Sequence, residues 1–511
     1  MNHILKLTVI FMVVSFSAFA QKECVLFNDV QQAKITGVHF ENVKLKEANR
    51  NETVLRNFLN PNEVFFFDLA TTDLFNSKTR AINLVLPFNN KNKILELVEV
   101  SESFYDYVVT TSCGQSFPAS RDIKHYRGVV QGEENSLVAI TFFENKVTGL
   151  IATNDGNFNL LSDKQSDRHI FYNTENLKER KFYTCTTEDV FDIEDSDFLF
   201  EQDKNFGKQK LHDEFQNSNR AVKFYFETEY GIFQTRGSIA SVEVYVTTLF
   251  NQVATIYQNE NIPTEVSDIH IRNLSGIYNA STPKTLLTQF QNNRTSINGD
   301  LGILLTFRPI GGGEAAGVRN ALCTTSTSAR LAVAEVHNAT FFDPVYDWSV
   351  MVVAHEFGHL FGIPHTNSCY WRGINGQPID RCGGTQPDPF GNPNSICPAG
   401  PLPANGGGTI MSLCHLVSNV GIRFANGFGH HPGNLLRDNY SNSTCLQICT
   451  FINLQGTQPP SPQTHRRVEC RVIEVENVTV PSGTTLELDA EQRVSIGNGF
   501  KVNSGGTFII R

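Results

Sequence analysis

Short runs of alternating apolar and polar residues fill the chain from residue 21 to about residue 215. Examples are Leu95-Glu-Leu-Val-Glu-Val and Leu137-Val-Ala-Ile-Thr-Phe-Phe. A period of two places successive side chains on opposite faces of a strand. This part is therefore predicted to be rich in β-structure. A polar stretch over 203–219 follows, which we interpret as an exposed linker and a processing site.

The pattern changes near Arg220, where longer periodic segments begin. The spacing predicts a long helix over 237–259 and a second helix that Thr282-Pro283 opens and that ends near Asn293. Strands are predicted at Val222-Lys-Phe-Tyr-Phe-Glu-Thr, Ile269-His-Ile, Leu301-Gly-Ile-Leu-Leu-Thr-Phe and Arg330-Leu-Ala-Val-Ala-Glu-Val. A short last helix is expected from Pro432. This mixture predicts a domain that combines helices with a sheet.

The C-terminal part has a third pattern. Residues 453–468 are rich in proline and are predicted to be a linker. In 469–511, short apolar pairs such as Leu486-Glu-Leu alternate with Pro-Ser-Gly, Gly-Asn-Gly and Ser-Gly-Gly turns. Evenly spaced short strands with glycine turns are typical of a small stacked β module.

One segment carries candidate metal chemistry. The apolar, proline-free run from Trp348 predicts a buried helix that continues into His355-Glu-Phe-Gly-His-Leu-Phe-Gly-Ile-Pro-His365. His355 and His359 are four residues apart, so both imidazoles lie on one helix face and can hold one zinc ion. Gly362 lets the chain turn so that His365 becomes a third ligand, and Glu356 is placed to act as a general base. Three histidines that merely fill a core would rarely follow this spacing.

This motif resembles the signature of the metzincin zinc endopeptidases, and the chain looks most like their adamalysin, or reprolysin, branch. The methionine turn of that family has its counterpart in Gly408-Thr-Ile-Met-Ser-Leu-Cys. The resemblance implies an α+β catalytic domain and one catalytic Zn²⁺ held by His355, His359 and His365. It also implies that Met411 lies beneath the ligands, that Glu356 is catalytic, and that protein or peptide substrates pair with an edge strand within 311–322. A structural Ca²⁺ is compatible with this picture.

Two positions depart from the relatives. Thr366 follows the third histidine, where adamalysins usually carry aspartate, so a hydrogen bond near the metal is expected to differ. Leu413 stands where astacin-like and serralysin-like enzymes have tyrosine, so no tyrosine ligand or oxyanion donor is expected. Leu413 and His415 are predicted to line the substrate pocket, although His415 is equally compatible with a surface position. The pair His430-His431 is predicted to be solvated.

The first residues indicate export. Met1 to Ala20 has Lys6, an apolar stretch and Ala-Phe-Ala before the expected cleavage, as in a signal peptide. No later stretch is long enough for a transmembrane anchor, so a secreted, extracellular protein is predicted. The net charge of −10, without a Lys/Arg cluster, argues against nucleic acid as a partner. The expected parts are a signal peptide (1–20), a β-rich pro-domain that confers latency (21–218), the protease domain (219–452), the linker (453–468) and the β module (469–511).

The eleven cysteines are an odd number, so at least one thiol lacks an intramolecular partner. Cys185 lies between the pro-domain body and the catalytic start, where adamalysin-like zymogens carry a switch cysteine. Its thiolate could fill the fourth zinc position. Cys113 is the competing candidate, and an ordinary disulfide is the third alternative.

The other cysteines are candidates for disulfides in an exported chain. By resemblance, Cys323 would pair with Cys445. The cysteines around the methionine turn would form two more bridges of open connectivity, namely Cys369, Cys382, Cys397 and Cys414. If Cys185 is free, Cys24 would bridge to Cys113, which leaves Cys449 with Cys470.

Two other functions compete with a latent zinc endopeptidase. One is a catalytically silent extracellular adhesion protein on the same fold, which the terminal β module suggests through contact with a cell surface or matrix. The intact Glu356 argues against it, because binding alone does not need a base. The other is a zinc hydrolase that acts on a different bond, which the predicted substrate-pairing edge disfavours.

Overall fold

The computed structural model describes residues 24–48, 59–60, 63–69, 79–88, 91–162, 168–178, 184–189, 220–338, 347–372, 376–386, 396–446, 449–460 and 464–510. The predicted signal peptide and the predicted processing stretch over 203–219 lie outside these residues. Within the described ranges, no helix combines the length and apolar character that a membrane span requires.

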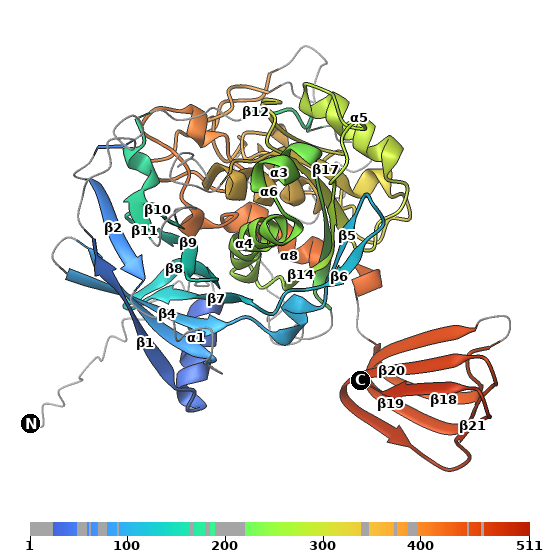
Figure 1. Cartoon of the computed structure of the whole chain (residues 1–511). Coiled ribbons are helices and arrows are strands. Elements are labelled where there is room, and N and C mark those ends of the chain that lie inside the picture. Colours follow the sequence, from blue (N-terminus) through green and yellow to red (C-terminus); the bar gives the residue numbers. More distant parts are fainter. Residues whose placement is uncertain are drawn as a thin grey trace, which may run out of the picture.

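Nine described strands of the N-terminal part close into a barrel (Figure 1). They are β1 (Phe40–Glu47), β2 (Val64–Leu69), β3 (Ala81–Phe88), β4 (Lys91–Glu99), β7 (Ile123–Val130), β8 (Glu133–Phe143), β9 (Lys146–Thr153), β10 (Gly156–Ser162) and β11 (Arg168–Asn173). Alternate residues fill the interior, so Leu95 and Leu97 of β4 meet Val138 and Ile140 of β8 in one apolar cluster. Helix α1 (Val25–Ile35) packs outside, against β7. The predicted β-rich character is confirmed.

The central domain is a mixed α/β structure around an eight-stranded sheet of order β12-β16-β17-β15-β13-β14-β5-β6. Its strands are β12 (Thr184–Cys185), β16 (Gly312–Ala315), β17 (Leu331–Glu335), β15 (Leu301–Thr306), β13 (Val222–Thr228), β14 (Thr264–Ile271), β5 (Val108–Thr111) and β6 (Ser116–Pro118). The strands from β17 to β5 run parallel, whereas β16 is antiparallel to β17. Both outer ends of this sheet are formed by residues from the N-terminal part of the chain.

Helices pack on both faces of this sheet, because successive side chains of each strand point to opposite faces. Ile303 and Leu305 of β15 belong to the large apolar core that includes α4 (Ile239–Gln258) and α6 (Asp347–Leu360). Leu304, between them, points to the opposite face and packs with Leu286 and Phe290 of α5 (Pro283–Asn293). Helix α5 begins where predicted, because Thr282 accepts a hydrogen bond from the Thr285 amide as N-cap.

The remaining helical elements lie in connections or near the domain end. They are α3 (Tyr230–Arg236), α8 (His430–Ser441) and the 3-10 turns η4 (Glu102–Tyr105), η5 (Thr174–Asn176), η7 (Ser328–Arg330), η8 (Cys369–Trp371), η9 (Cys414–Leu416), η10 (Phe424–Asn426) and η11 (Thr444–Leu446). The edge strand predicted within 311–322 is short, because β16 covers Gly312–Ala315 only.

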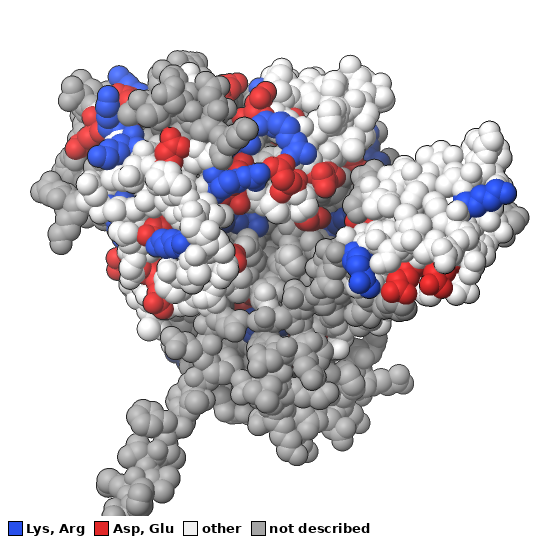
Figure 2. All heavy atoms as spheres, turned by 90° about the horizontal axis from the view of Figure 1, so that it is seen from below, with Lys and Arg blue, Asp and Glu red and all other residues white. Residues whose placement is uncertain are grey.

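The C-terminal part is a small sheet with its own apolar core, at the lower right of Figure 1. It comprises β18 (Cys449–Thr457), β19 (His465–Val480), β20 (Thr485–Ile496), β21 (Lys501–Val502) and β22 (Thr507–Ile510). All their pairings are parallel. Strands β18 and β19 overlap the predicted linker (453–468), and Pro459 and Pro460 lie in the connection between these two strands. Figure 2 shows one face of the whole chain, on which basic and acidic side chains of the described residues lie interspersed.

Candidate active site

Helix α6 carries the motif and is buried on all sides. From Ser349 to Leu360 every residue is buried, as the apolar sequence predicts for a helix inside a core. The helix then ends in a Schellman motif, in which Gly362 N donates to His359 O at 2.8 Å and Ile363 N donates to Gly358 O at 3.0 Å. Gly362 has φ = 87°, a conformation that favours glycine. This turn brings His365 back to the helix.

The three histidines converge on one point. Nε2 of His355 lies 3.0 Å from Nε2 of His359 and 3.2 Å from Nε2 of His365. The Nδ1 atom of His355 donates to Ile410 O at 2.7 Å, and that of His359 donates to Ile363 O at 2.8 Å. Because a carbonyl only accepts hydrogen bonds, each Nδ1 carries the proton and each Nε2 offers its lone pair to the centre.

This donor set fits a zinc ion. Tetrahedral zinc with Zn–N bonds of about 2.0–2.1 Å places its nitrogen ligands roughly 3.3 Å apart. The observed Nε2 separations are close to that value. Burial and then the charge of His365 hold the pKa values of His355 and His359 well below the usual range of imidazole, which keeps both rings in the neutral form that binds metal.

Met411 lies beneath this cluster, where the sequence places the methionine turn. It is fully buried, and a Cβ atom added to Gly358 would lie only 2.5 Å from its Sδ atom. Its carbonyl accepts a hydrogen bond from the amide of Thr366 at 3.1 Å. Thr366, where adamalysins usually have aspartate, thus ties the third histidine's segment to the methionine turn.

Glu356 lies between α6 and the edge strand β16. It is fully buried, and a Cβ atom added to Gly313 of β16 would lie 2.5 Å from its Oε1. Glycine at this position therefore lets the carboxylate approach the edge-strand backbone. A peptide bond laid along β16 would come close to both the carboxylate and the histidine cluster.

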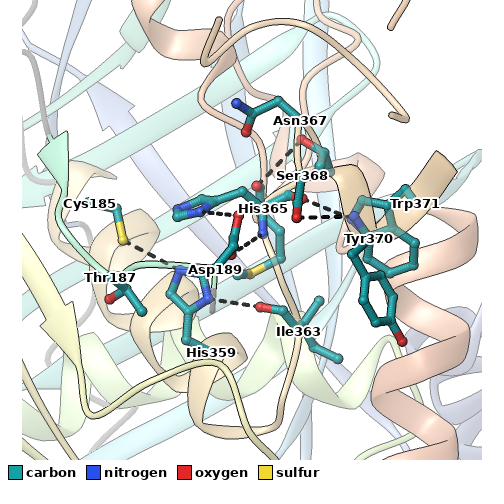
Figure 3. Close-up of polar contacts among 12 residues, drawn as sticks. Cys185, Thr187, Asp189, His359, Ile363, His365, Asn367, Ser368, Tyr370 and Trp371 are labelled. Atoms are coloured by element: carbon teal, nitrogen blue, oxygen red, sulfur yellow. Dashed lines mark hydrogen bonds and ion pairs between the residues drawn. The ribbon is translucent and has the colours of Figure 1, made fainter. Parts of the chain in front are cut away.

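A short N-terminal segment occupies this edge of the sheet (Figure 3). Strand β12 pairs with β16 in parallel, with Cys185 opposite Gly313. Cys185 Sγ lies 3.4 Å from His359 Nε2, close to the roughly 3.6 Å expected for a sulfur and a nitrogen on one zinc ion. The ligand atoms of Cys185 and the three histidines lie within 4.8 Å of one another. Cys113, in contrast, is exposed in the turn between β5 and β6.

Two further residues of this segment face the site, and the sequence prediction missed both. The Thr187 hydroxyl donates to Glu356 Oε2 at 3.3 Å, and Asp189 Oδ2 accepts from His365 Nδ1 at 3.2 Å. Burial acts to lower the pKa of His365, but the Asp189 carboxylate and Cys185 together outweigh it and raise this pKa well above its usual range. Residues 185, 187 and 189 alternate along an extended chain, a signal that could have identified them.

The other predicted residues lie around this centre or away from it. Leu413 is half-buried, while His415 is buried and packs edge-to-face on Trp348 with ring centroids 5.0 Å apart. His430 is exposed at the start of α8 and takes no part in the histidine cluster.

Three disulfides are described. They join Cys323 to Cys445, Cys369 to Cys397, and Cys382 to Cys414. Cys470 is also disulfide-bonded, and Cys449 is its neighbour across β18 and β19. The Cys24–Cys113 bridge predicted from the count is wrong, because Cys113 is free and the Cys24 thiol donates to Asn135 Oδ1 at 3.0 Å.

Comparison with known proteins identifies the family of the central domain. Residues 218–417 match the model Reprolysin_5, described as metallo-peptidase family M12. No curated protein matches the chain. Among solved structures, one described as "Structure of a chaperone-substrate complex" is 12% identical, covers 61% of this chain and has a TM-score of 0.26. The match spans 39% of that chain, and its low TM-score carries no argument about the fold. Residues 218–417 therefore form a reprolysin-like metallopeptidase domain of family M12, with His355, His359 and His365 as its candidate zinc ligands.

Proposed function

We propose that this chain is a secreted zinc endopeptidase that is made as a latent zymogen. The observation that carries the proposal is the convergence of three imidazoles beside a buried carboxylate and a sheet edge. A bound zinc ion would polarise the scissile carbonyl and lower the pKa of water. His355, His359 and His365 would hold this ion, and the hydrogen bonds of their Nδ1 atoms would fix the orientation of the rings.

Glu356 would act as the general base. Its carboxylate would accept a proton from the attacking water and deliver it to the leaving amine. The substrate would lie extended along β16, because unpaired backbone groups of an edge strand can bind a peptide as an added strand. Such binding along the strand requires no free chain end, and it therefore favours an endopeptidase.

The segment over 184–189 would keep the enzyme latent. It pairs with β16 where the substrate would bind, and Cys185 Sγ, 3.4 Å from His359 Nε2, would fill the fourth zinc position. Thr187 engages the proposed base, and Asp189 holds the third histidine. We infer that water and substrate are both excluded until this segment leaves. In this reading, residues 21–218 are a pro-domain and residues 219–452 the protease.

Secretion is part of the same proposal. The disulfides support it, because such bridges persist in oxidising compartments. The proposed signal peptide is residues 1–20. The β module from residue 469 would contact a cell surface or matrix, and a structural Ca²⁺ remains compatible with the fold.

The proposal is tested by hydrolysis of casein with processed enzyme, with and without a zinc chelator. Glu356→Ala should retain the metal and lose at least ~100-fold in rate, as expected for a missing general base. Asn292→Ala, which removes an exposed polar side chain of α5 in the catalytic domain, serves as the matched control and should leave the rate unchanged. Processed, zinc-loaded protein that cleaves nothing would overturn the proposal and favour an adhesion protein on this fold. Full activity in Glu356→Ala would exclude this residue as the base.

Latency is tested separately in the unprocessed chain. Cys185→Ala should raise its basal peptidase activity, and Thr187→Val or Asp189→Asn should raise it to a smaller extent. Glu188→Gln is the matched control, because this exposed side chain lies in the same segment but does not contact the histidines or Glu356. Activation by Cys113→Ala, but not by Cys185→Ala, would show that the wrong switch residue has been named.

A further inference from the structure

We infer that the N-terminal barrel stays bound to the catalytic domain after processing and is a lasting part of the working enzyme. This inference rests on the proposed function, because it concerns what happens after the latent chain is cut. A pro-domain that only blocks the active site and dissociates after cleavage would contact the enzyme mainly at that site. Here the short segment 184–189 contacts the site, whereas the described residues between 24 and 178 contact the catalytic domain elsewhere.

The first observation is the shared sheet. Strand β5 pairs in parallel with β14, with Val108 opposite Asp268 and Thr111 opposite Ile271. Strand β6 then pairs with β5 and covers its outer side. Loss of the N-terminal part would expose the edge of β14, with unpaired backbone groups and a risk of edge-to-edge aggregation. This edge lies at the opposite end of the sheet order from β16.

The second observation is helix α4, which lies between the sheet and the barrel strands β7 and β8 (Figure 1). Almost every residue of α4 from Val242 to Tyr257 is buried, although one face of a helix on a domain surface should be polar and exposed. Leu137 and Ala152 of the barrel belong to the same apolar core as Phe250 of this helix. The barrel therefore buries a face of α4 that would otherwise be open to water.

The third observation is a set of buried polar pairs across this contact. Tyr107 OH and the Ser120 amide both donate to Glu243 Oε1 of α4, at 2.8 and 2.7 Å. Arg127 of β7 donates to Asn251 Oδ1 at 2.9 Å and also to Gln258 Oε1 at 2.7 Å. Glu243 and Asn251 are buried, so removal of the barrel would leave them without these partners.

The barrel also holds the chain beyond the methionine turn. The buried Asn157 side chain donates to Ile422 O at 2.9 Å and accepts from Phe424 N at 3.0 Å. These two hydrogen bonds pair the Asn157 side chain with the backbone of residues 422–424, in the way that a neighbouring strand would. This segment follows the predicted pocket residues Leu413 and His415 in the chain. The barrel therefore helps to position the segment after Met411, and the catalytic domain alone is expected to be less active as well as less stable.

The test uses the full chain with sites for a sequence-specific protease inserted within 179–183 and within 190–219. Cutting at both sites releases the segment 184–189 and leaves the contacts of β5, β6 and α4 intact. Size-exclusion chromatography under native conditions should then show the barrel fragment and the catalytic fragment eluting together in equal amounts. Separation of two folded fragments would overturn the inference.

A variant of the contact gives a second readout. Arg127→Ala should speed dissociation of the cut fragments at least tenfold, while the uncut variant shows the circular dichroism spectrum of the parent chain. Arg121→Ala is the matched control, because this half-exposed arginine pairs with Glu102 and Asp106 within the N-terminal part. Equal dissociation of both variants would also contradict the inference.

Activity separates this inference from the proposed function. Fragments that elute together without cleaving casein would support barrel retention and contradict the zinc endopeptidase. Fragments that separate while the catalytic fragment keeps full activity would support the endopeptidase and overturn barrel retention. Casein hydrolysis by the fragments that elute together, with a lower rate once dilution has separated them, would support both the endopeptidase and barrel retention.

Discussion

Gly358 shows how one residue connects the motif to the fold. It lies between the two candidate zinc ligands of the helix, and a Cβ atom there would come within 2.5 Å of Met411 Sδ and 3.0 Å of a ring carbon of Phe428. Gly358→Ala should therefore lower the free energy of unfolding by about 1–3 kcal/mol, because the crowding outweighs alanine's higher helix propensity. Urea denaturation of the parent chain and the variant measures this difference in the free energy of unfolding.

The matched control for that substitution is Gly231→Ala in α3, where an added Cβ meets nothing within 4 Å. It should be neutral or stabilise by up to about 1 kcal/mol. Equal effects of the two substitutions would show that Met411 does not pack against this glycine.

Asp347 gives a prediction about pH. It is buried at the start of α6, and burial raises the pKa of its carboxyl to about 6, although bonds to Thr174 and the Trp348 amide act in the other direction. A raised carboxyl pKa costs stability above the folded pKa, and this cost disappears below the unfolded pKa. Asp347→Asn should thus raise the free energy of unfolding at neutral pH, by up to about 3 kcal/mol. The gain should vanish below about pH 4 in denaturation at several pH values; a gain independent of pH would contradict this assignment.

The chain sequence predicted most residues of the site because its spacing follows local helix geometry. His355, His359 and Glu356 share one helix, and Gly362 explains the return of His365. The roles of Thr187 and Asp189 could not be predicted in the same way. Their partners Glu356 and His365 are 169 and 176 residues further along the chain, and only the alternation with Cys185 points from these two residues to the site.

At the scale of elements, the bridge between Cys323 and Cys445 joins the loop after β16 to η11 and closes a loop of 122 residues. In the chain-entropy model a loop of this length corresponds to about 5 kcal/mol. A Cys323→Ser/Cys445→Ser double variant should therefore unfold at a clearly lower temperature. Cys113→Ser, which removes a free and exposed thiol, is the control and should unfold at the parent temperature. Equal melting temperatures of the two variants in calorimetry would contradict a structural role for the bridge.

Element prediction succeeded where a segment forms its own pattern and failed where pairing is distant. The apolar run at Leu301 predicted β15, and the Thr282-Pro283 pair predicted the start of α5. Strands β5 and β6 were assigned to the pro-domain together with the barrel strands, although they extend the catalytic sheet. Val108 and its partner Asp268 belong to strands far apart in the chain, and alternation alone does not indicate which sheet a strand joins.

At the scale of the whole molecule, the C-terminal sheet is the part least connected to the active site. Its apolar cluster, built around residues such as Ile473 and Leu486, is separate from the large core that surrounds α6. We propose that the protease domain ends just after η11 rather than at the predicted residue 452, because Leu446 belongs to the large core and its carbonyl accepts from Arg220 N at 2.8 Å. A chain that ends after residue 448 should therefore keep the peptidase rate of the full chain after processing.

A second truncation shows whether that boundary is placed correctly. A chain that ends after residue 440 loses Cys445 and Leu446, and with them the bridge to Cys323 and the bond to Arg220. It should melt at a lower temperature than the chain that ends after residue 448, since both lack the β module and the shorter chain also lacks these contacts. If the chain that ends after residue 448 loses its activity towards casein, the β module takes part in catalysis or in substrate binding. Unchanged casein hydrolysis with lost attachment to cells or matrix would instead assign that module to surface contact.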